Sequence, residues 1–120
     1  SRYHLSFNLG YPNAHDRANQ RTGDFLMVHG NCVSIGCYAM GDAAIEEIYT
    51  LMQAALRNGQ HSIDVHIFPF RYDSTKIRWQ DSEWHSFWSD LKPGFDAFNT
   101  NNKLPGITVV NRRYKVSAAP

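Results

Sequence analysis

Residues 29–40 read His29-Gly30-Asn31-Cys32-Val33-Ser34-Ile35-Gly36-Cys37-Tyr38-Ala39-Met40, and the chain is organised around this stretch. An apolar run of strand type, residues 25–28, precedes it, and Gly41-Asp42 opens an amphipathic helix after it. A cysteine between a strand and a helix start can be held as a thiolate, because the helix N-terminus and a nearby imidazolium both favour negative charge. Gly36 allows a sharp turn that aims the N–H groups near Cys37 at one oxygen atom. The stretch therefore predicts a reactive thiol.

Three interpretations of this stretch stay open on the residues alone. In the first, Cys37 is a nucleophile and His29 is its base. In the second, His29, Cys32 and Cys37 bind zinc with His66 as a fourth ligand, although the two thiols lack the two-residue separation of common zinc sites. In the third, the cysteine is a buried structural residue beside a turn, since cysteine is among the most buried residue types.

Hydrophobic periodicity along the chain predicts an α+β fold. Alternation of apolar and polar residues predicts strands at residues 3–9, 25–29, 62–70, 107–110 and 114–116. The last two strands are predicted to form a hairpin with its turn at Asn111-Arg112. Apolar residues at helical spacing predict helices at residues 42–58 and 81–91, the first of them capped by Asp42 and stopped by Gly59.

Composition and charge indicate a globular protein and argue against several classes of partner. The chain has 120 residues, of which 42% are hydrophobic and 13% aromatic, as expected for one globular domain that buries about two-thirds of its unfolded surface. Its net charge of +1 predicts neither a nucleic-acid partner nor a charged membrane surface as a partner. The sequence contains no run of about 20 apolar residues, so it predicts no membrane span. Residues Ser1–His4 lack the apolar core of a signal peptide.

Residues 28–40, followed by Asp42-x-x-Ile45-x-Glu47-Ile48-Tyr49, resemble the catalytic segment of L,D-transpeptidases of the YkuD type, and within that family the divergent YafK-like branch. The segments at residues 5–13 and 65–70 resemble the same branch. Two positions depart from the general family pattern. Ile35 stands where a histidine usually precedes the glycine of the cysteine turn, and Ala39 stands where an arginine is usual.

The resemblance implies a single L,D-transpeptidase catalytic domain over residues 1–120, with a mainly antiparallel, sandwich-like β-sheet and two helices. In that family, further strands of the domain come before the segment that matches residues 5–9. Because only four residues precede Leu5 in this sequence, we expect residues 1–120 to be the C-terminal part of the domain. We also expect an upstream segment or a second copy of the chain to cover the strand edge that would otherwise be exposed.

The resemblance also implies a cysteine enzyme of the bacterial envelope, placed in the periplasm. Cys37 would attack a carbonyl of a peptidoglycan stem peptide next to meso-diaminopimelate, while His29 takes the thiol proton. Ser34 would orient the imidazole, and the N–H groups of Gly36 and Cys37 would hold the oxyanion. An amine would then convert the acyl-enzyme into a cross-link, or water would hydrolyse it. The branch includes a hydrolase that releases a wall-linked lipoprotein, which favours hydrolysis.

The polar loop predicted at residues 10–24 lies near the active-site mouth in that family. Asn13, Asp16 and Arg17 are therefore predicted to contact the substrate, with His15 as a further candidate. The reaction needs no metal and no organic cofactor. Two other classes of protein stay open: a non-catalytic peptidoglycan-binding or toxin-associated module with the same fold, and a zinc-binding domain.

Overall fold

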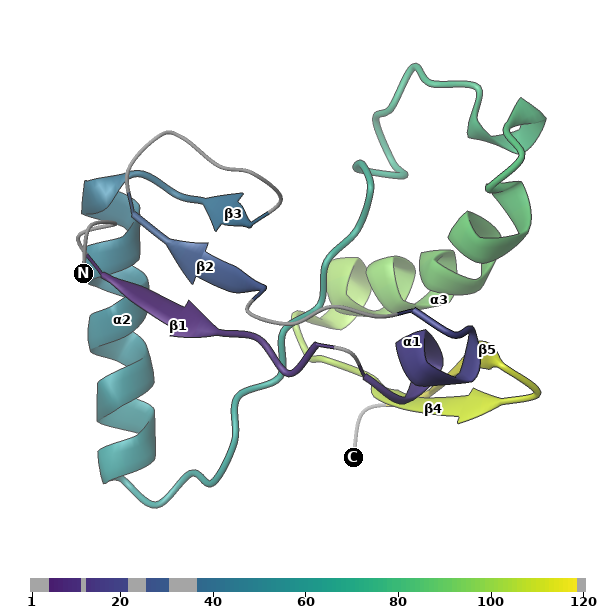
Figure 1. Ribbon diagram of the computed structural model, residues 1–120. Helices are drawn as coiled ribbons and strands as arrows, with labels where there is room; N and C mark the ends of the chain where they lie inside the picture. Colours follow the sequence, from purple (N-terminus) through teal and green to yellow (C-terminus); the bar gives the residue numbers. More distant parts are fainter. Residues whose placement is uncertain (1–4, 12, 22–25, 31–36, 119–120) are drawn as a thin grey trace. The chain divides into compact units, whose positions relative to one another are not determined.

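A computed structural model of the chain describes residues 5–11, 13–21, 26–30 and 37–118 (Figure 1). The chain divides into two compact units. The first unit is formed by Ser1–Asp16 and Arg21–Val65, and the second by Arg17–Gln20 and His66–Pro120. Helices and two small sheets make this an α+β fold, as predicted. The sandwich-like arrangement and the single domain over residues 1–120 stay predictions.

The first unit contains a three-stranded mixed sheet in the order β1-β2-β3. Strand β1 (Ser6–Asn8) pairs antiparallel with β2 (Met27–His29), and β2 pairs parallel with β3 (Tyr38–Ala39). The pairing continues past the strand ends, because the N–H of Gly30 donates to the Leu5 carbonyl at 2.9 Å. Strands were predicted where β1 and β2 lie. Strand β3 was not predicted, because the sequence signals there indicated a cysteine turn leading straight into a helix.

Helix α2 (Asp42–Arg57) packs against β2 in the first unit (Figure 1). Its N-cap is Gly41 rather than the predicted Asp42, which is the first helical residue. At its end, Gly59 adopts a φ of 97°, and its N–H and that of Gln60 donate to the carbonyls of Leu56 and Ala55. These two bonds form the stop that the glycine predicted, since only glycine adopts this backbone conformation without strain.

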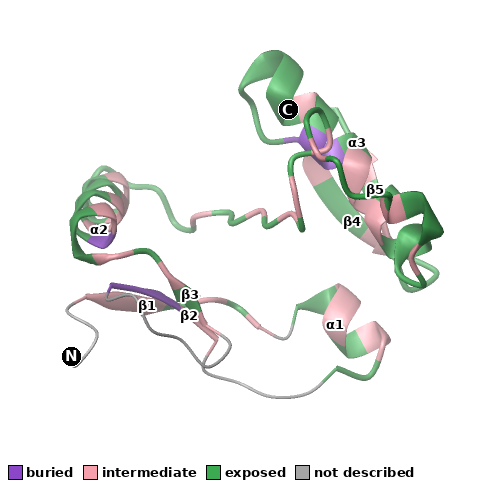
Figure 2. Cartoon of the chain, turned by 90° about the horizontal axis from the view of Figure 1, so that it is seen from above, coloured by how far each residue is buried: buried purple, intermediate pink, exposed green. Residues whose placement is uncertain are grey.

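The core of the first unit lies between β2 and α2 (Figure 2). Ile45 in α2 is fully buried, and Val28 and His29, whose side chains point to opposite faces of the sheet, are buried in β2. The rest of the predicted apolar face of α2 is less covered. Ile48, Tyr49, Met52 and Ala55 are half-buried, whereas Leu56 is exposed, contrary to its predicted core position.

Helix α3 (His85–Asn101) is the main element of the second unit and is longer than the helix predicted at residues 81–91. The turn of 3₁₀-helix η1 (Trp79–Asp81) precedes it. The Lys92-Pro93-Gly94 sequence was interpreted as the helix end, but α3 continues through Pro93. Burial of Phe95 offsets the hydrogen bond that proline cannot donate, and Lys92 pairs with Asp96 across the same turn at 2.7 Å.

Strands β4 (Gly106–Val110) and β5 (Arg113–Ser117) form the predicted hairpin beside α3. Both turn residues have positive φ angles, 52° at Asn111 and 62° at Arg112, as a tight two-residue hairpin requires. The guanidinium of Arg113 donates to both carboxylate oxygens of Asp90, at 2.8 and 2.7 Å. This bidentate pair ties the hairpin to α3.

The strand predicted at residues 62–70 is wrong, since the structure describes these residues and assigns them no strand. The alternation of buried and exposed residues in this segment comes from packing on α3 instead. His66, Phe68 and Phe70 are half-buried, whereas Val65 and Ile67 are exposed. The ring of Phe68 lies 5.7 Å from that of Phe95, and the ring of Phe70 lies 5.4 Å from that of Trp88. An extended segment packed on a helix has therefore produced the pattern of a half-buried strand.

The loop predicted at residues 10–24 contains a short helix, α1 (Ala14–Ala18). Along the sequence, the division between the two units falls within this helix. Within the described part of the chain, no helix combines the length and the apolar character needed to cross a membrane.

Candidate active site

His29 is held rigidly at the end of β2. Its imidazole is 1% exposed. Its backbone carbonyl accepts a hydrogen bond from the N–H of Met40 at 2.8 Å, and the next residue, Gly30, bonds to Leu5 on the other side. The backbone at His29 is therefore fixed between two neighbouring strands, and burial fixes the ring.

One contact determines the tautomer of His29. Nδ1 lies 2.5 Å from the carbonyl oxygen of Gly30. A carbonyl oxygen only accepts hydrogen bonds, so Nδ1 must carry the proton. Nε2 then carries the lone pair and is the nitrogen that can accept a proton.

Cys37 is a partly exposed thiol that immediately precedes β3. The strand register pairs Ala39 with His29. Cys37 stands two residues before Ala39, at a bend of the chain just before β3 begins. The register therefore brings the start of β3, which directly follows Cys37, beside the end of β2, which carries His29.

The position of Cys37 differs from the predicted one in one respect. Strand β3 lies between Cys37 and α2, which begins at Asp42. The field of a helix dipole falls off within the first turn. Cys37 is thus not at the helix N-terminus, and stabilisation of its thiolate by His29 stays a prediction.

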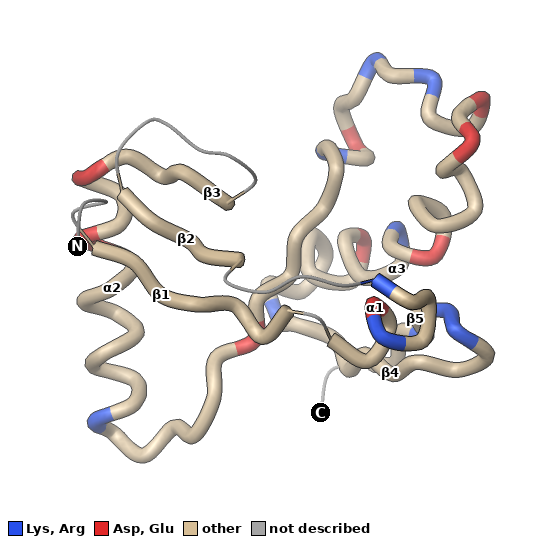
Figure 3. The backbone as a smooth tube through the Cα atoms, in the orientation of Figure 1, with Lys and Arg blue, Asp and Glu red and all other residues tan. Residues whose placement is uncertain are grey.

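Strands β1, β2 and β3 contain no Lys, Arg, Asp or Glu (Figure 3). The acceptor described at Nδ1 of the imidazole is the carbonyl of Gly30. Sequence reasoning did not predict this contact, and the orienting role that it gave to Ser34 stays a prediction. No sequence signal could have revealed the contact with Gly30, because every residue has a carbonyl group.

Two predicted site residues, Ser34 and Gly36, lie outside the described residues, so the hydroxyl and the oxyanion donor stay predictions. Cys32, which the zinc interpretation requires, also lies outside them. Among the residues that are described, no three His, Cys, Asp or Glu side chains come together in a way that could hold a metal ion.

The predicted substrate contacts Asn13 and Asp16 have a structural role at α1. The N–H of Asn13 donates to Oδ2 of Asp16 at 3.0 Å, and the N–H of Asp16 donates to Oδ1 of Asn13 at 2.9 Å. This reciprocal pair caps the helix. Arg17 is exposed on the same helix. A role in substrate binding stays a prediction for all three residues.

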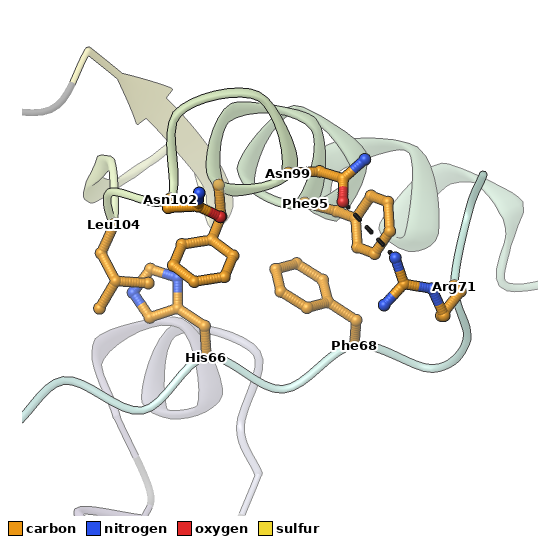
Figure 4. A pocket seen from close by; sticks show the side chains of 8 residues that line it. His66, Phe68, Arg71, Phe95, Asn99, Asn102 and Leu104 are labelled. Carbon is orange, nitrogen blue, oxygen red and sulfur yellow. Dashed lines mark hydrogen bonds between the residues drawn. The ribbon is translucent and has the colours of Figure 1, made fainter.

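The second unit contains a pocket that sequence reasoning did not predict. It lies between residues 66–71 and the C-terminal half of α3 (Figure 4). Its apolar lining consists of Phe68, Phe95, Phe98 and Leu104, and its polar lining of His66, Arg71, Asn99 and Asn102. The alternation at His66, Phe68 and Phe70 was the available signal, but it was interpreted as a strand.

Two known proteins that share one name are similar to this chain. The chain is 49% identical over 118 residues to "Putative L,D-transpeptidase YafK" of Escherichia coli strain K12, and equally to the protein of the same name in Escherichia coli O157:H7. The matched region is 98% of this chain and 48% of each relative, so the chain spans about half the length of the curated relatives it matches. No protein-family model matches the sequence.

Proposed function

Because the chain resembles YafK-like L,D-transpeptidases over nearly its whole length, as its sequence predicted, we propose that it carries the catalytic cysteine site of an envelope enzyme that acts on peptidoglycan stem peptides. The observation that carries this proposal is the contact between His29 Nδ1 and the Gly30 carbonyl. It supports an imidazole whose Nε2 can take a proton, on a strand that pairs with the strand directly following Cys37.

In the proposed reaction, His29 Nε2 takes the proton of the Cys37 thiol, and the thiolate attacks a carbonyl carbon next to meso-diaminopimelate. The carbonyl oxygen becomes an oxyanion, held by the N–H groups of Gly36 and Cys37. When the tetrahedral intermediate collapses, the C–N bond breaks and the imidazolium returns the proton to the leaving amine. The product is a thioester on Cys37. Ser34 assists by hydrogen-bonding the imidazole or the thiol.

The thioester is resolved by an amine or by water, and the same residues serve both outcomes. We favour hydrolysis, including release of a wall-linked lipoprotein, in the periplasm. The proposal includes the sandwich-like L,D-transpeptidase fold. It also includes an upstream segment or a second copy of the chain that covers the sheet edge.

Mass spectrometry of muropeptides incubated with the chain tests this function. We expect the wild type to make or cut a stem-peptide bond, Cys37→Ala to do neither, and Cys32→Ala to keep most of the activity. Equal loss of activity in both cysteine variants, with zinc bound to the purified wild type, would favour the metal interpretation. Binding of muropeptides without any product from the wild type would favour a non-catalytic module.

A further inference from the structure

The second-unit pocket, with the eight lining residues given above, combines an apolar floor with polar groups at its rim (Figure 4). Its volume is about 310 Å³. Phe68 and Phe95 pack edge to face, with their ring planes at 84°. A mostly apolar hollow with a few converging polar groups is the usual form of a small-molecule site.

Arg71 is only partly engaged by the protein. Its Nη2 donates to Asp73 Oδ2 at 3.1 Å and to Asn99 Oδ1 at 3.5 Å, and its guanidinium carbon lies 5.5 Å from the centre of the Phe95 ring. Among the described residues, neither Nε nor Nη1 of Arg71 has a hydrogen-bond acceptor. Each of these two nitrogens can therefore donate a single hydrogen bond to a second anion, whereas Nη2, which belongs to both bidentate edges of the guanidinium, is held by Asp73 and Asn99.

Two further rim groups have no hydrogen bond from their side chains within the described part of the chain. These are the imidazole of His66 and the carboxamide of Asn102. Asn102 ends α3 in the left-handed conformation, with a φ of 57°. An imidazole and a carboxamide can each donate and accept, so they suit the alternating N–H and C=O groups of a peptide.

The cation in the lining favours a ligand with a carboxylate. Arg71 lies over the ring of Phe95, which is 9% exposed, whereas Phe98 is 44% exposed, so binding of a sugar is a competing outcome that the experiment below separates. A carboxylate oxygen can accept the hydrogen bond that Nε or Nη1 of Arg71 still offers. Methylene groups suit the floor formed by Phe68, Phe98 and Leu104. The ligand that fits is thus an aliphatic residue ending in a carboxylate.

We propose that this pocket binds a short acidic peptide, with the carboxylate of an aliphatic residue on Arg71 and the methylene chain of that residue on the phenylalanine floor. The identification of that peptide as a stem peptide ending in diaminopimelate rests on the proposed function. The pocket would then be a substrate-binding site separate in sequence from the Cys37 stretch.

Calorimetric binding to the Cys37→Ala chain tests the pocket without any chemistry. The two probes are the tripeptide L-alanyl-γ-D-glutamyl-meso-diaminopimelate and the same tripeptide with both diaminopimelate carboxyls amidated. Loss of a charge-assisted hydrogen bond predicts that Arg71→Gln weakens binding of the acid by roughly 10- to 100-fold. Arg71→Gln should not change binding of the amidated form, because that form has no diaminopimelate carboxylate for Arg71 to hold.

Arg78→Gln is the matched control. It removes the same charge from a side chain that is 86% exposed, pairs with Asp81 and does not line the pocket. We expect it to leave both affinities unchanged. Asn102→Asp is an independent variant, since aspartate tolerates the left-handed conformation. Its added negative charge should weaken binding of the acid and spare the amidated form.

Equal affinity of the wild-type pocket for the two probes would overturn the inference. So would equal binding of the acid by the Arg71→Gln and Arg78→Gln chains, or displacement of the acid by a disaccharide that lacks the peptide. If the expected binding pattern appears but the wild type never processes muropeptides, the pocket inference holds and the proposed catalytic function fails.

Discussion

Nδ1 of His29 lies 2.5 Å from the carbonyl oxygen of Gly30. The backbone of the residue that follows the histidine thus orients the ring, a role that a side chain performs in many nucleophile–base pairs. The consequence is a defined tautomer with its lone pair on Nε2. Cys37 directly precedes the strand that pairs with β2 at His29, and we propose that this contact prepares His29 as the base for its thiol.

The first prediction concerns the thiol reactivity of Cys37. Iodoacetamide reacts with thiolates, so His29→Gln, which keeps a polar side chain but removes the base, should slow alkylation of Cys37 at pH 7 by about tenfold or more. Peptide mapping of the alkylated chain measures the rate at each cysteine. His66→Gln, which changes a histidine of the second unit, should leave the rate unchanged. Identical rates in the two histidine variants would remove His29 from the role of base.

The second prediction concerns the core of the first unit. Ile45→Ala should lower the free energy of unfolding by roughly 2–4 kcal/mol, because Ile45 is fully buried between α2 and β2. Leu51→Ala on the same helix should cost less than about 0.5 kcal/mol, since Leu51 is 64% exposed. Urea denaturation followed by circular dichroism measures both. A larger loss at Leu51 than at Ile45 would mean that the opposite face of α2 is the buried one.

The third prediction tests the length of α3. Proline in a helix interior is less favourable than alanine by about 3 kcal/mol, part of which is returned by the stiffness proline gives the unfolded chain. If α3 continues through Pro93, then Pro93→Ala should raise the free energy of unfolding, by roughly 1–2 kcal/mol. If the helix ended before Pro93, the same substitution would instead be neutral or destabilising, and the thermal midpoint distinguishes the two cases.

Local signals in the sequence predicted the parts of the fold that local contacts determine. Gly59 predicted the end of α2, and Asn111-Arg112 predicted the hairpin turn, because both features depend on backbone conformation alone. Asn13 and Asp16 carried an equally local signal for α1, a capping pair three residues apart, and it was overlooked. The sequence therefore contained usable signals besides the hydrophobic periodicity of strands and helices, namely capping and turn residues.

Tertiary contacts explain the errors. Pro93-Gly94 is a stop signal unless burial of the next residue, Phe95, outweighs it. The alternation around Phe68 fits a strand as well as an extended segment lying on a helix, and only the aromatic contact with Phe95 decides between them. At the site, the roles of Cys37 and His29 rest on residue type and stay predictions. The contact of His29 with the Gly30 carbonyl was not predicted, because a backbone carbonyl leaves no trace in the sequence.

The fourth prediction concerns the carboxyl of Asp73. The hydrogen bond from Arg71 lowers the pKa of this carboxyl below its ordinary value of 3.8. Since the folded-state pKa is the lower one, the pair stabilises the folded chain above the ordinary carboxyl pKa, and this contribution is lost as the pH falls through the folded-state pKa. In an NMR titration, Arg71→Gln should raise the pKa of Asp73, and Arg78→Gln should leave it unchanged. An Asp73 titration unaffected by Arg71→Gln would contradict the pairing at the pocket rim.

The most direct measurement of the central claim is the mass of the intact chain after brief incubation with muropeptides and acid quenching. We predict a covalent adduct with the mass of a stem-peptide acyl group, mapped to the peptide that contains Cys37 and released by hydroxylamine as a thioester should be. The adduct should form on Cys32→Ala and be absent from Cys37→Ala. No adduct on a wild type that turns over its substrate, or an adduct that persists in Cys37→Ala, would contradict Cys37 as the nucleophile.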